Sequence, residues 1–442
     1  MGRSAKSWKP WPPRWSAGVR EAVTPESVTP EQPVIYASGL VLPVSGPAIR
    51  DGAVLVRDGR ISSIGTISDL ERDNPNAEVR RFPRQTIVPG AVNVHAHLGF
   101  RRGDGPEGGP FSNWLAALIE RLPEKEAWTA EAARNSAREA VEAGTTFMAE
   151  SSPYGECLPQ LAESGMVGTV YAEFFPHDIG DGTPEGAVDF IFEEARKLRE
   201  GLPERVDCAV SVHSTYTVDP ESSRLAARRS REMGWRLAVH ISESPEEVEF
   251  VRNGTGGLTA IFGSNEWGGT GLSPVLYAEN IELLSPGTIA AHLATEVSEE
   301  DIGVLARTGT AAAHCPRSND FLDCGVSPVP RMIERGVRVG IGTDGLWSSP
   351  SLNVFEEALF AVDLHGFDGA TGLELATIGG ARALGVGDET GSLEAGKWAD
   401  LAVVDVAPSG SEPERQILEA AADGGVVATV AGGRLIYNRD EG

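Results

Sequence analysis

Several patterns that mark particular protein classes are missing from this chain of 442 residues. No run of about 18 or more apolar residues occurs, so we expect no transmembrane helix and no membrane association. The N-terminal residues lack the apolar core and cleavage site of an export signal. The four cysteines show no CxxC spacing, which favours a reducing compartment over a disulfide framework. These absences predict a cytoplasmic globular protein.

Positive charge is also scarce. Lys and Arg together number 38 against 64 Asp and Glu, which gives a net charge of −26 and an isoelectric point near 4.7. Such a field repels nucleic acid and anionic membranes, so neither is expected as a partner. Adaptation to salt would explain an acidic surface that is poor in lysine, but a GC-rich genome and simple solubility explain it equally well.

The chain divides by composition into four parts. Residues 1–33 form a basic, Pro-rich extension with Trp8, Trp11 and Trp15, which is either a disordered tail or a segment that docks on a partner. Residues 34–87 and 385–442 share short apolar runs separated by DG and GG turns, which are hairpin signals. We expect these two segments to form one small antiparallel β-sandwich, with residues 88–384 inserted between them as the catalytic domain.

Residues 88–384 alternate strand-like and helix-like patterns. Eight strand candidates, such as 92–97, 207–217 and 337–345, are mostly separated by amphipathic stretches such as 129–144 and 220–234. Eight such units over roughly 290 residues suit a (β/α)₈ TIM barrel of the α/β class. An open doubly wound sheet would usually carry a glycine-rich phosphate turn after its first strand, and none is present.

Histidines gather at the ends of the predicted strands. Seven of the eight lie at carboxyl-terminal strand ends, and His365 lies in a helical stretch: the seven are His95, His97, His177, His213, His240, His292 and His314. In a barrel these ends build the active site, so we expect the side chains to converge on one mouth.

The segment VNVHAH places two imidazoles on one strand. Side chains two residues apart point the same way, so His95 and His97 both face the barrel axis and can bind one metal. Two histidines satisfied by backbone groups would be the plain alternative. His240 with Glu243 in HISE, and Asp344 in GTDG, favour the metal, because three imidazoles and one carboxylate suit zinc, with ferrous iron as the alternative. No lysine stands at a strand end to bridge a second ion, so one divalent metal is expected.

In this order the motifs resemble the amidohydrolase superfamily, over about residues 34–440. They look like its one-metal deaminase and chlorohydrolase branch. FSNWLAALIER, VYAEFF and HCPRSN are similar to aminodeoxyfutalosine deaminases of menaquinone synthesis and to adenosylhomocysteine and methylthioadenosine deaminases. Gly99 departs from this pattern, because the futalosine type tends to carry glutamate there. The ribose-binding glutamate of the adenosylhomocysteine type has only Glu120 and Glu124 near its expected place.

The resemblance implies a role for each site residue. His95, His97, His240 and Asp344 would hold the metal, and Asp344 would also act as a base. Glu243 would shuttle protons, His292 would be a catalytic hydrogen-bonding histidine, and His213 would orient the heterocycle. The expected reaction is hydrolytic deamination of an adenine-bearing nucleoside or a related aminoheterocycle, with aminodeoxyfutalosine as the first choice of substrate.

Other residues of these motifs have two readings each. Trp114 and Phe111 either stack on the base or pack the first loop helix, and Arg121 either pairs with a substrate carboxylate or is a solvated charge. Glu173 is a candidate substrate contact through its motif. Ser348 either hydrogen-bonds near the site or belongs to a Ser-Ser-Pro turn. His177 and His314 are expected near the site without a defined role.

Two rival functions remain open at this point. The same metal-activated water would serve a hydrolase of another leaving group, such as chloride from a triazine or the amide of a cyclic ureide. A barrel without chemistry is the other rival, but buried polar groups are costly to keep without a use. For assembly, a homodimer or larger homo-oligomer is an expectation from the resemblance alone.

Overall fold

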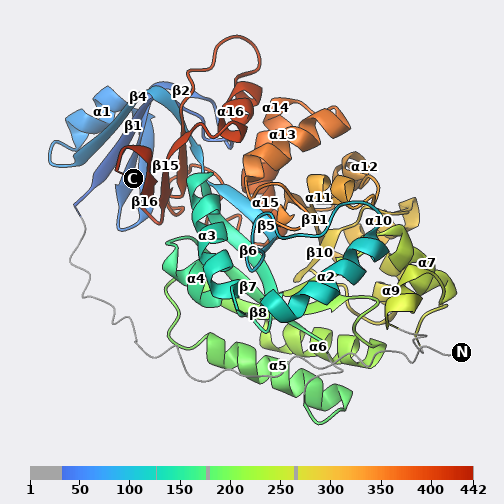
Figure 1. The fold of residues 1–442 in the computed structure, drawn as a ribbon. Coiled ribbons are helices and arrows are strands. Elements are labelled where there is room, and N and C mark those ends of the chain that lie inside the picture. Colours follow the sequence, from blue (N-terminus) through green and yellow to red (C-terminus); the bar gives the residue numbers. More distant parts are fainter. Residues whose placement is uncertain (1–31, 126, 176–179, 263–266, 442) are drawn as a thin grey trace, which may run out of the picture.

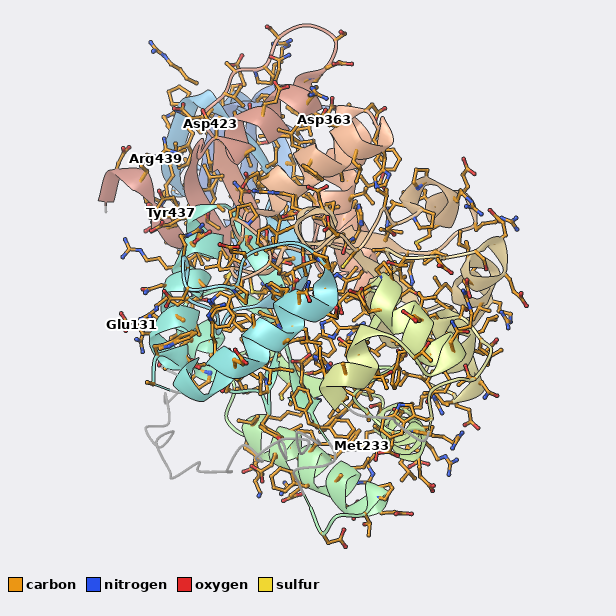
Figure 2. All side chains as sticks on the ribbon, turned by 45° about the vertical axis from the view of Figure 1, so that its right-hand side comes forward. Glu131, Met233, Asp363, Asp423, Tyr437 and Arg439 are labelled. Carbon is orange, nitrogen blue, oxygen red and sulfur yellow. The ribbon has the colours of Figure 1, made fainter. Side chains whose placement is uncertain are left out.

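The computed structural model describes residues 32–125, 127–175, 180–262 and 267–441 (Figure 1). Within these ranges the chain forms a ring of parallel strands with a mixed sheet beside it. No helix in the described ranges is long and apolar enough to cross a membrane. Charged side chains such as Glu131, Asp363 and Asp423 are exposed at the periphery, as Figure 2 shows.

The ring is a (β/α)₈ barrel, which confirms the predicted fold. Its strands are β5 (Ala91–His97), β6 (Thr145–Pro153), β7 (Val167–Phe174), β8 (Val206–Ser214), β9 (Leu237–Ile241), β10 (Thr288–His292), β11 (Ala311–His314), β12 (Val339–Ile341) and β13 (Asp344–Gly345). The last two belong to one stretch of chain. β12 pairs with β11 and β13 pairs with β5, both in parallel, so this stretch closes the ring.

Helices cover the outside of the barrel. They are α2 (Phe111–Lys125), α3 (Thr129–Glu142), α4 (Leu158–Glu163), α5 (Pro184–Leu198), α6 (Pro220–Met233), α7 (Pro245–Asn253), α8 (Gly257–Phe262), α9 (Pro274–Asn280), α10 (Glu299–Thr308), α11 (Pro316–Phe321), α12 (Val329–Glu334), α13 (Val354–His365), α14 (Gly369–Glu374) and α15 (Gly380–Ala383), with a π-helical turn at Leu375–Gly379. Local signals set their ends. The Asp219 side chain accepts from the backbone N–H groups of Glu221 and Ser222 to start α6, and Gly234 ends it in a left-handed conformation.

The barrel interior is filled by small and apolar side chains below the mouth. Alternate residues of neighbouring strands point inward, among them Ala209 of β8, Ala238 of β9 and Ala291 of β10. The alternation breaks in β5, where the register with β6 shifts between Asn93 and Ala96. The shift is what lets β5 turn both Val94 and the histidines after it inward.

Both chain ends form the second domain. Its strands are β1 (Val34–Val41), β2 (Ile49–Arg57), β3 (Arg60–Thr66), β4 (Glu78–Pro89), β14 (Leu401–Val404), β15 (Val426–Ala431) and β16 (Arg434–Asn438), with α1 (Ile67–Asp73), α16 (Pro413–Ala422) and a 3₁₀ turn at Arg439–Glu441. They make one sheet in the order β16-β15-β14-β4-β1-β2-β3, with blue and red segments side by side in Figure 1. The sheet curls on itself, because β3 returns to bridge Arg60 with Trp398, next to β14.

The expectation of a wholly antiparallel sheet is wrong. β1 and β4 run parallel, whereas the other neighbours run antiparallel. The reason lies in the connection, since α1 carries the chain from β3 back across the sheet to the far side of β1. A crossover of this kind is what parallel neighbours require, and the hairpin signals alone do not reveal it.

Candidate active site

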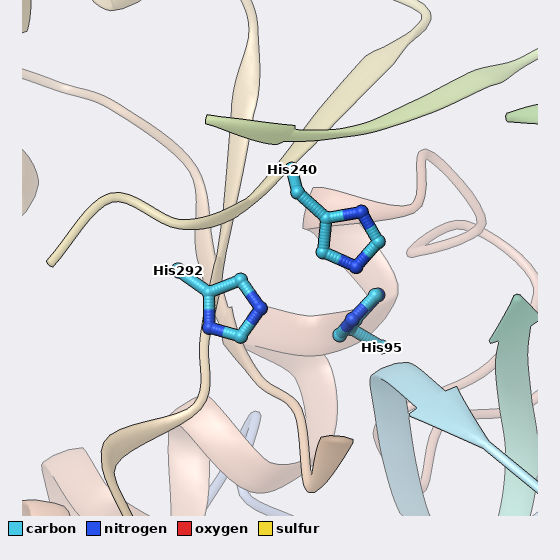
Figure 3. Close-up of side chains that lie close together, drawn as sticks. All are labelled: His95, His240 and His292. Atoms are coloured by element: carbon cyan, nitrogen blue, oxygen red, sulfur yellow. The ribbon is translucent and has the colours of Figure 1, made fainter. Parts of the chain in front are cut away.

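Three imidazoles and one carboxylate meet at the carboxyl ends of the barrel strands. They are His95 and His97 of β5, His240 of β9 and Asp344 of β13. The Nε2 atoms of His97 and His95 lie 3.3 and 3.7 Å from Asp344 Oδ1. The ring centroids of His95 and His240 are 4.8 Å apart, and Figure 3 shows these two rings and that of His292 turned toward one another.

Backbone carbonyl groups set which ring nitrogen of His97 and His240 carries the proton. His97 Nδ1 lies 2.7 Å from the carbonyl oxygen of Ser151, and His240 Nδ1 lies 2.6 Å from that of His213. A carbonyl only accepts, so Nδ1 carries the proton in both rings and Nε2 keeps its lone pair. His95 Nε2 is buried and has no hydrogen-bond partner within the described ranges. Nε2 of His97 and of His240 thus has the lone pair that a metal ion needs, and Nε2 of His95 is unpartnered within the described ranges.

Burial keeps the imidazoles of His95 and His240 neutral. It lowers the pKa of His240 well below the usual value, and the nearby rings of His95 and His213 lower it further. Burial and His97 act the same way on the pKa of His95. A neutral imidazole is the form that binds a metal ion.

Asp344 is held from one side by two hydroxyl groups. Ser318 and Ser348 each donate to its Oδ2 at 2.6 Å, while Oδ1 faces the histidines. Burial alone would raise the pKa of Asp344, but the neighbouring rings of His97 and His292 outweigh it and hold that pKa below the usual range. The carboxylate is therefore ionised, with one oxygen free toward the histidines.

These residues fit a metal ion. His95, His97 and Asp344 offer ligand atoms within 4.8 Å of one another, and so do His95, His240 and His292. Three neutral nitrogens and one carboxylate oxygen form a donor set suited to zinc or ferrous iron. His292 also lies close enough to count among the donors, although the sequence predicts only a hydrogen-bonding role for it.

Glu243 lies directly beside this cluster. It follows β9, after Ser242 in a left-handed backbone conformation with φ of 52°. Its backbone N–H donates to Glu247 Oε2 at 2.7 Å, and its side chain is buried. Burial, and then the charge of Asp344, raise the pKa of Glu243 well above its usual range. The carboxyl group therefore takes up a proton more readily than an exposed glutamate does.

His292 is turned into the site by an unusual backbone. Its φ is 69°, a left-handed conformation that a non-glycine residue rarely adopts outside functional positions. Its Nδ1 lies 2.9 Å from Asn319 Oδ1, and its Nε2 lies 3.6 Å from Glu243 Oε1. Because an amide oxygen only accepts, Nδ1 carries the proton and Nε2 faces Glu243 with its lone pair.

His213 and Glu173 lie on the other side of His240. His213 Nδ1 is 2.8 Å from the Thr217 hydroxyl, and its ring is 5.0 Å from that of His240 and 4.9 Å from that of Phe175. Glu173 is buried, with one carboxylate oxygen 3.9 Å from His240 Nδ1. The structure thus places both predicted substrate contacts within the same strand-end cluster.

In helix α2, the two aromatic residues of the motif are engaged by a backbone hydrogen bond and by core packing. Trp114 is half-buried, and its Nε1 donates to the carbonyl oxygen of Trp347 at 3.2 Å. Phe111 is buried in the core, which is the packing role favoured for it. Arg121 lies exposed two turns beyond Trp114, and its role stays a prediction.

The expectation that seven strand-end histidines share the mouth is wrong for His314. Ala311 and Ala313 point into the barrel, so His314 points outward, toward α13. There its Nε2 lies 3.1 Å from Nε2 of His365, the histidine expected to need no special role. β11 has no register shift of the kind that β5 has, so the regular alternation of its side chains points His314 away from the mouth. His177 lies outside the described residues.

Three contacts of the site were not predicted from the sequence. Ser318 holds Asp344, Asn319 holds His292, and Glu247 holds the backbone of Glu243. Ser318 and Asn319 belong to the HCPRSN motif, which was noticed only as a resemblance. Both readings of Ser348 are confirmed, because its hydroxyl donates to Asp344 and the residue lies in the turn after β13.

Comparisons with known proteins agree with the motifs. The model of the amidohydrolase family matches residues 86–436. A 5-methylthioadenosine/S-adenosylhomocysteine deaminase of Symbiobacterium thermophilum is 30% identical over 438 residues, covering 91% of this chain and 93% of the relative.

Two solved structures share the architecture. An adenosine deaminase from Xanthomonas campestris with bound zinc is 25% identical, with a TM-score of 0.78 over 92% of this chain and 93% of that one. The aminofutalosine deaminase of Helicobacter pylori is 22% identical, with a TM-score of 0.79 over 91% of this chain and 99% of that one, a likeness that shows the fold alone. With the family model covering most of its length, the chain belongs to the amidohydrolase family and is a hydrolase of carbon–nitrogen bonds.

Proposed function

We propose that this enzyme hydrolytically deaminates an adenine-bearing nucleoside and releases ammonia. The observation that carries the proposal is the meeting of His95, His97, His240 and Asp344 beside a buried glutamate, in a chain similar over 91% of its length to a methylthioadenosine/adenosylhomocysteine deaminase. That similarity puts methylthioadenosine and adenosylhomocysteine ahead of aminodeoxyfutalosine, the first choice from motifs. The likeness to the aminofutalosine enzyme supports only the fold, so a place in menaquinone synthesis stays a prediction.

One divalent ion, with zinc first and ferrous iron second, is the proposed cofactor. His95, His97 and His240 would hold it through Nε2, and Asp344 through Oδ1. An ion of this kind makes a water molecule reactive at neutral pH and acts as a Lewis acid. The buried, unpartnered Nε2 of His95 supports the assignment, because such an atom is costly without a ligand.

Glu243 is the proposed proton shuttle. It takes a proton from the attacking water and delivers it to a ring nitrogen, which makes the carbon bearing the amino group electrophilic. His292 keeps its proton on Nδ1 and accepts through Nε2 from the hydroxyl group that forms on that carbon. Asp344 acts as the base that takes the second proton of that water and passes it to the amino group, which then leaves as ammonia. The 3.6 Å between His292 Nε2 and Glu243 Oε1 supports their acting on the same reacting centre.

The heterocycle would lie against the half-buried aromatic side chains near the mouth. Trp114, Phe175 and His213 are all partly exposed, so their rings can contact a planar base. His213 keeps Nδ1 on Thr217, which leaves Nε2 for a ring nitrogen of the substrate. Glu173 and Arg121 are proposed as further contacts, to the polar half of the nucleoside.

An ammonia-coupled assay tests the function. The zinc-loaded protein is incubated with methylthioadenosine, adenosylhomocysteine, adenosine and aminodeoxyfutalosine, with a chlorotriazine and a cyclic ureide as comparison substrates. We expect ammonia from at least one of the first two, with the corresponding inosine product by mass spectrometry. Turnover of the triazine or the ureide, without ammonia from any adenine nucleoside, would contradict the proposal.

A further inference from the structure

The two hydroxyl groups on Asp344 come from separate parts of the chain that meet at Glu357. Ser318 lies on α11 and Ser348 in the turn after β13. The neighbour of each serine contacts Glu357: the backbone N–H of Arg317 donates to Oε2 at 3.2 Å, and the Ser349 hydroxyl lies 3.0 Å from Oε1. Glu357 lies on α13 and is 0% exposed. One buried carboxyl group therefore joins both segments.

The hydrogen bonds around Ser349 indicate which form this carboxyl group takes. The Ser349 oxygen lies 3.0 Å from Glu357 Oε1 and 3.1 Å from the carbonyl oxygen of Ser351. The Ser349 hydroxyl has one proton, and the carbonyl only accepts. If Glu357 is ionised, the two contacts share that proton, whereas a protonated Glu357 can donate to Ser349 and give each contact a proton of its own.

The cation beside Glu357 is shared with a second carboxylate. Arg317 directs its guanidinium to Glu356, with Nη1 2.7 Å from Oε2, and its Nε is 3.8 Å from Glu357 Oε1. Burial raises the pKa of Glu357 to about 8, against the lowering effect of Arg317.

We propose that Glu357 is a positioning residue, a neutral carboxylic acid that accepts from Arg317, donates to Ser349 and so holds Ser318 and Ser348 on Asp344. The contact also fixes α11, whose Asn319 accepts from His292 at 2.9 Å. Loss of Glu357 would then displace a metal ligand and a catalytic histidine together. The inference rests on the proposed function only in treating Asp344 as a ligand and His292 as catalytic.

Two substitutions separate this role from a general effect on folding. Glu357→Gln keeps an acceptor for Arg317 and a donor for Ser349 without charge. Glu357→Met has a similar size and neither group. Asp301→Leu is the control, because Asp301 is another buried carboxylate that caps α10 away from Asp344.

Zinc retention, kinetics and crystal structures are the readouts. We expect Glu357→Gln to match the wild type within about threefold. Glu357→Met should lose zinc to a chelator about 10- to 100-fold faster and lose kcat with little change in KM, as positioning groups behind ligands do. Asp301→Leu should melt at a lower temperature but keep zinc and kcat. If Glu357→Met does not fold, Ser349→Ala removes one arm of the contact and should show a smaller loss of the same kind.

Crystal structures of Glu357→Met or Ser349→Ala need neither zinc nor substrate, and should show at least one serine hydroxyl away from Asp344. Wild-type zinc retention in these variants, or a loss in Glu357→Gln as large as in Glu357→Met, would overturn the proposal. A protein that retains zinc but releases no ammonia would refute the proposed function alone, since the zinc comparison still reports on Glu357.

Discussion

Individual side chains of the site are held mainly by hydrogen bonds to backbone carbonyl groups and serine hydroxyl groups around them. Ser151 and His213 orient two histidines through their carbonyl oxygens, and Ser318 and Ser348 occupy one oxygen of Asp344. Because these partners only accept or have one proton to give, they determine which atom of each ligand remains free. The hydrogen-bond partners of the candidate ligands thus determine which of their atoms can bind a metal ion.

The proton-shuttle role is tested at this scale by Glu243→Gln. An amide cannot carry the proton, so we expect kcat to fall about 10²- to 10⁴-fold with the zinc content unchanged. Rates of ammonia release and metal analysis measure the two effects. Glu249→Gln is the matched control, because Glu249 is exposed on α7 and should leave both values as they are. Full activity in Glu243→Gln would refute the assignment.

The sequence indicated the candidate ligands better than the residues that hydrogen-bond to them. His95, His97, His240 and Asp344 stand at strand ends, so a period of two and a barrel topology bring them together. Ser318 reaches Asp344 across 26 residues, and its serine side chain is as common on surfaces as in sites. A single polar residue carries no periodic signal, so its partner is known only once the loops are folded.

At the scale of single elements, irregularities in the strands decide what faces the mouth. β5 shifts register between Asn93 and Ala96, and Asn93 Nδ2 donates to the Thr343 hydroxyl at 2.8 Å, between β12 and β13. The eighth strand is thereby split, and Asp344 adopts a left-handed φ of 59°. In regular β11 the same alternation points His314 outward.

Because β6 packs closely against β7, we expect Gly168→Ala to destabilise the folded protein strongly. A Cβ at Gly168 would lie 1.9 Å from the carbonyl oxygen of Met148, which is backbone and cannot turn away. We expect the free energy of unfolding to fall by about 1–3 kcal/mol or more. Gly303→Ala in α10 is the control, because nothing lies within 4 Å of its Cβ, and alanine there should stabilise by about 0.5–1 kcal/mol. Denaturant titrations compare them, and equal stability of the two variants would contradict this.

On the scale of the whole molecule, a buried ion pair joins the barrel to the second domain. Arg205 precedes β8 and Asp400 precedes β14, with Arg205 Nη1 3.0 Å from Asp400 Oδ1. Their side chains are 11% and 1% exposed. Thr390 and the backbone of Gly432 also donate to Asp400. The carboxylate is thus fully paired where segments distant in the sequence meet.

Asp400→Asn tests this contact. It leaves the Arg205 charge buried without its partner, so we expect a loss of about 3–5 kcal/mol in the free energy of unfolding. Glu389→Gln breaks the exposed pair with Arg60 and should cost less than about 1 kcal/mol. Thermal and denaturant unfolding measure both changes. A small effect at Asp400 would show that the two domains are held together by apolar contacts instead.

Buried carboxyl groups also predict how stability changes with pH. Burial raises the pKa of Glu150 to about 7, above the usual 4.5. The folded state therefore binds this proton more tightly, and the resulting stability is present below pH 4.5 and is lost as the pH rises through about 7. Relative to the wild type, Glu150→Gln should become more stable by about 3 kcal/mol between pH 4.5 and pH 8. Denaturant titrations of both proteins across this range test the sign, and a difference independent of pH would contradict it.

The sequence by itself determined the alternation of strands and helices, and with it a barrel whose strand ends carry the candidate ligands. These features follow from local periodicity, which a chain displays before it folds. Only the tertiary structure decided the parallel pairing of β1 with β4, the register shift of β5 against β6 and the joining of two segments at Glu357. Each depends on a connection or a contact between distant segments, and no local pattern encodes which distant group a polar side chain will meet.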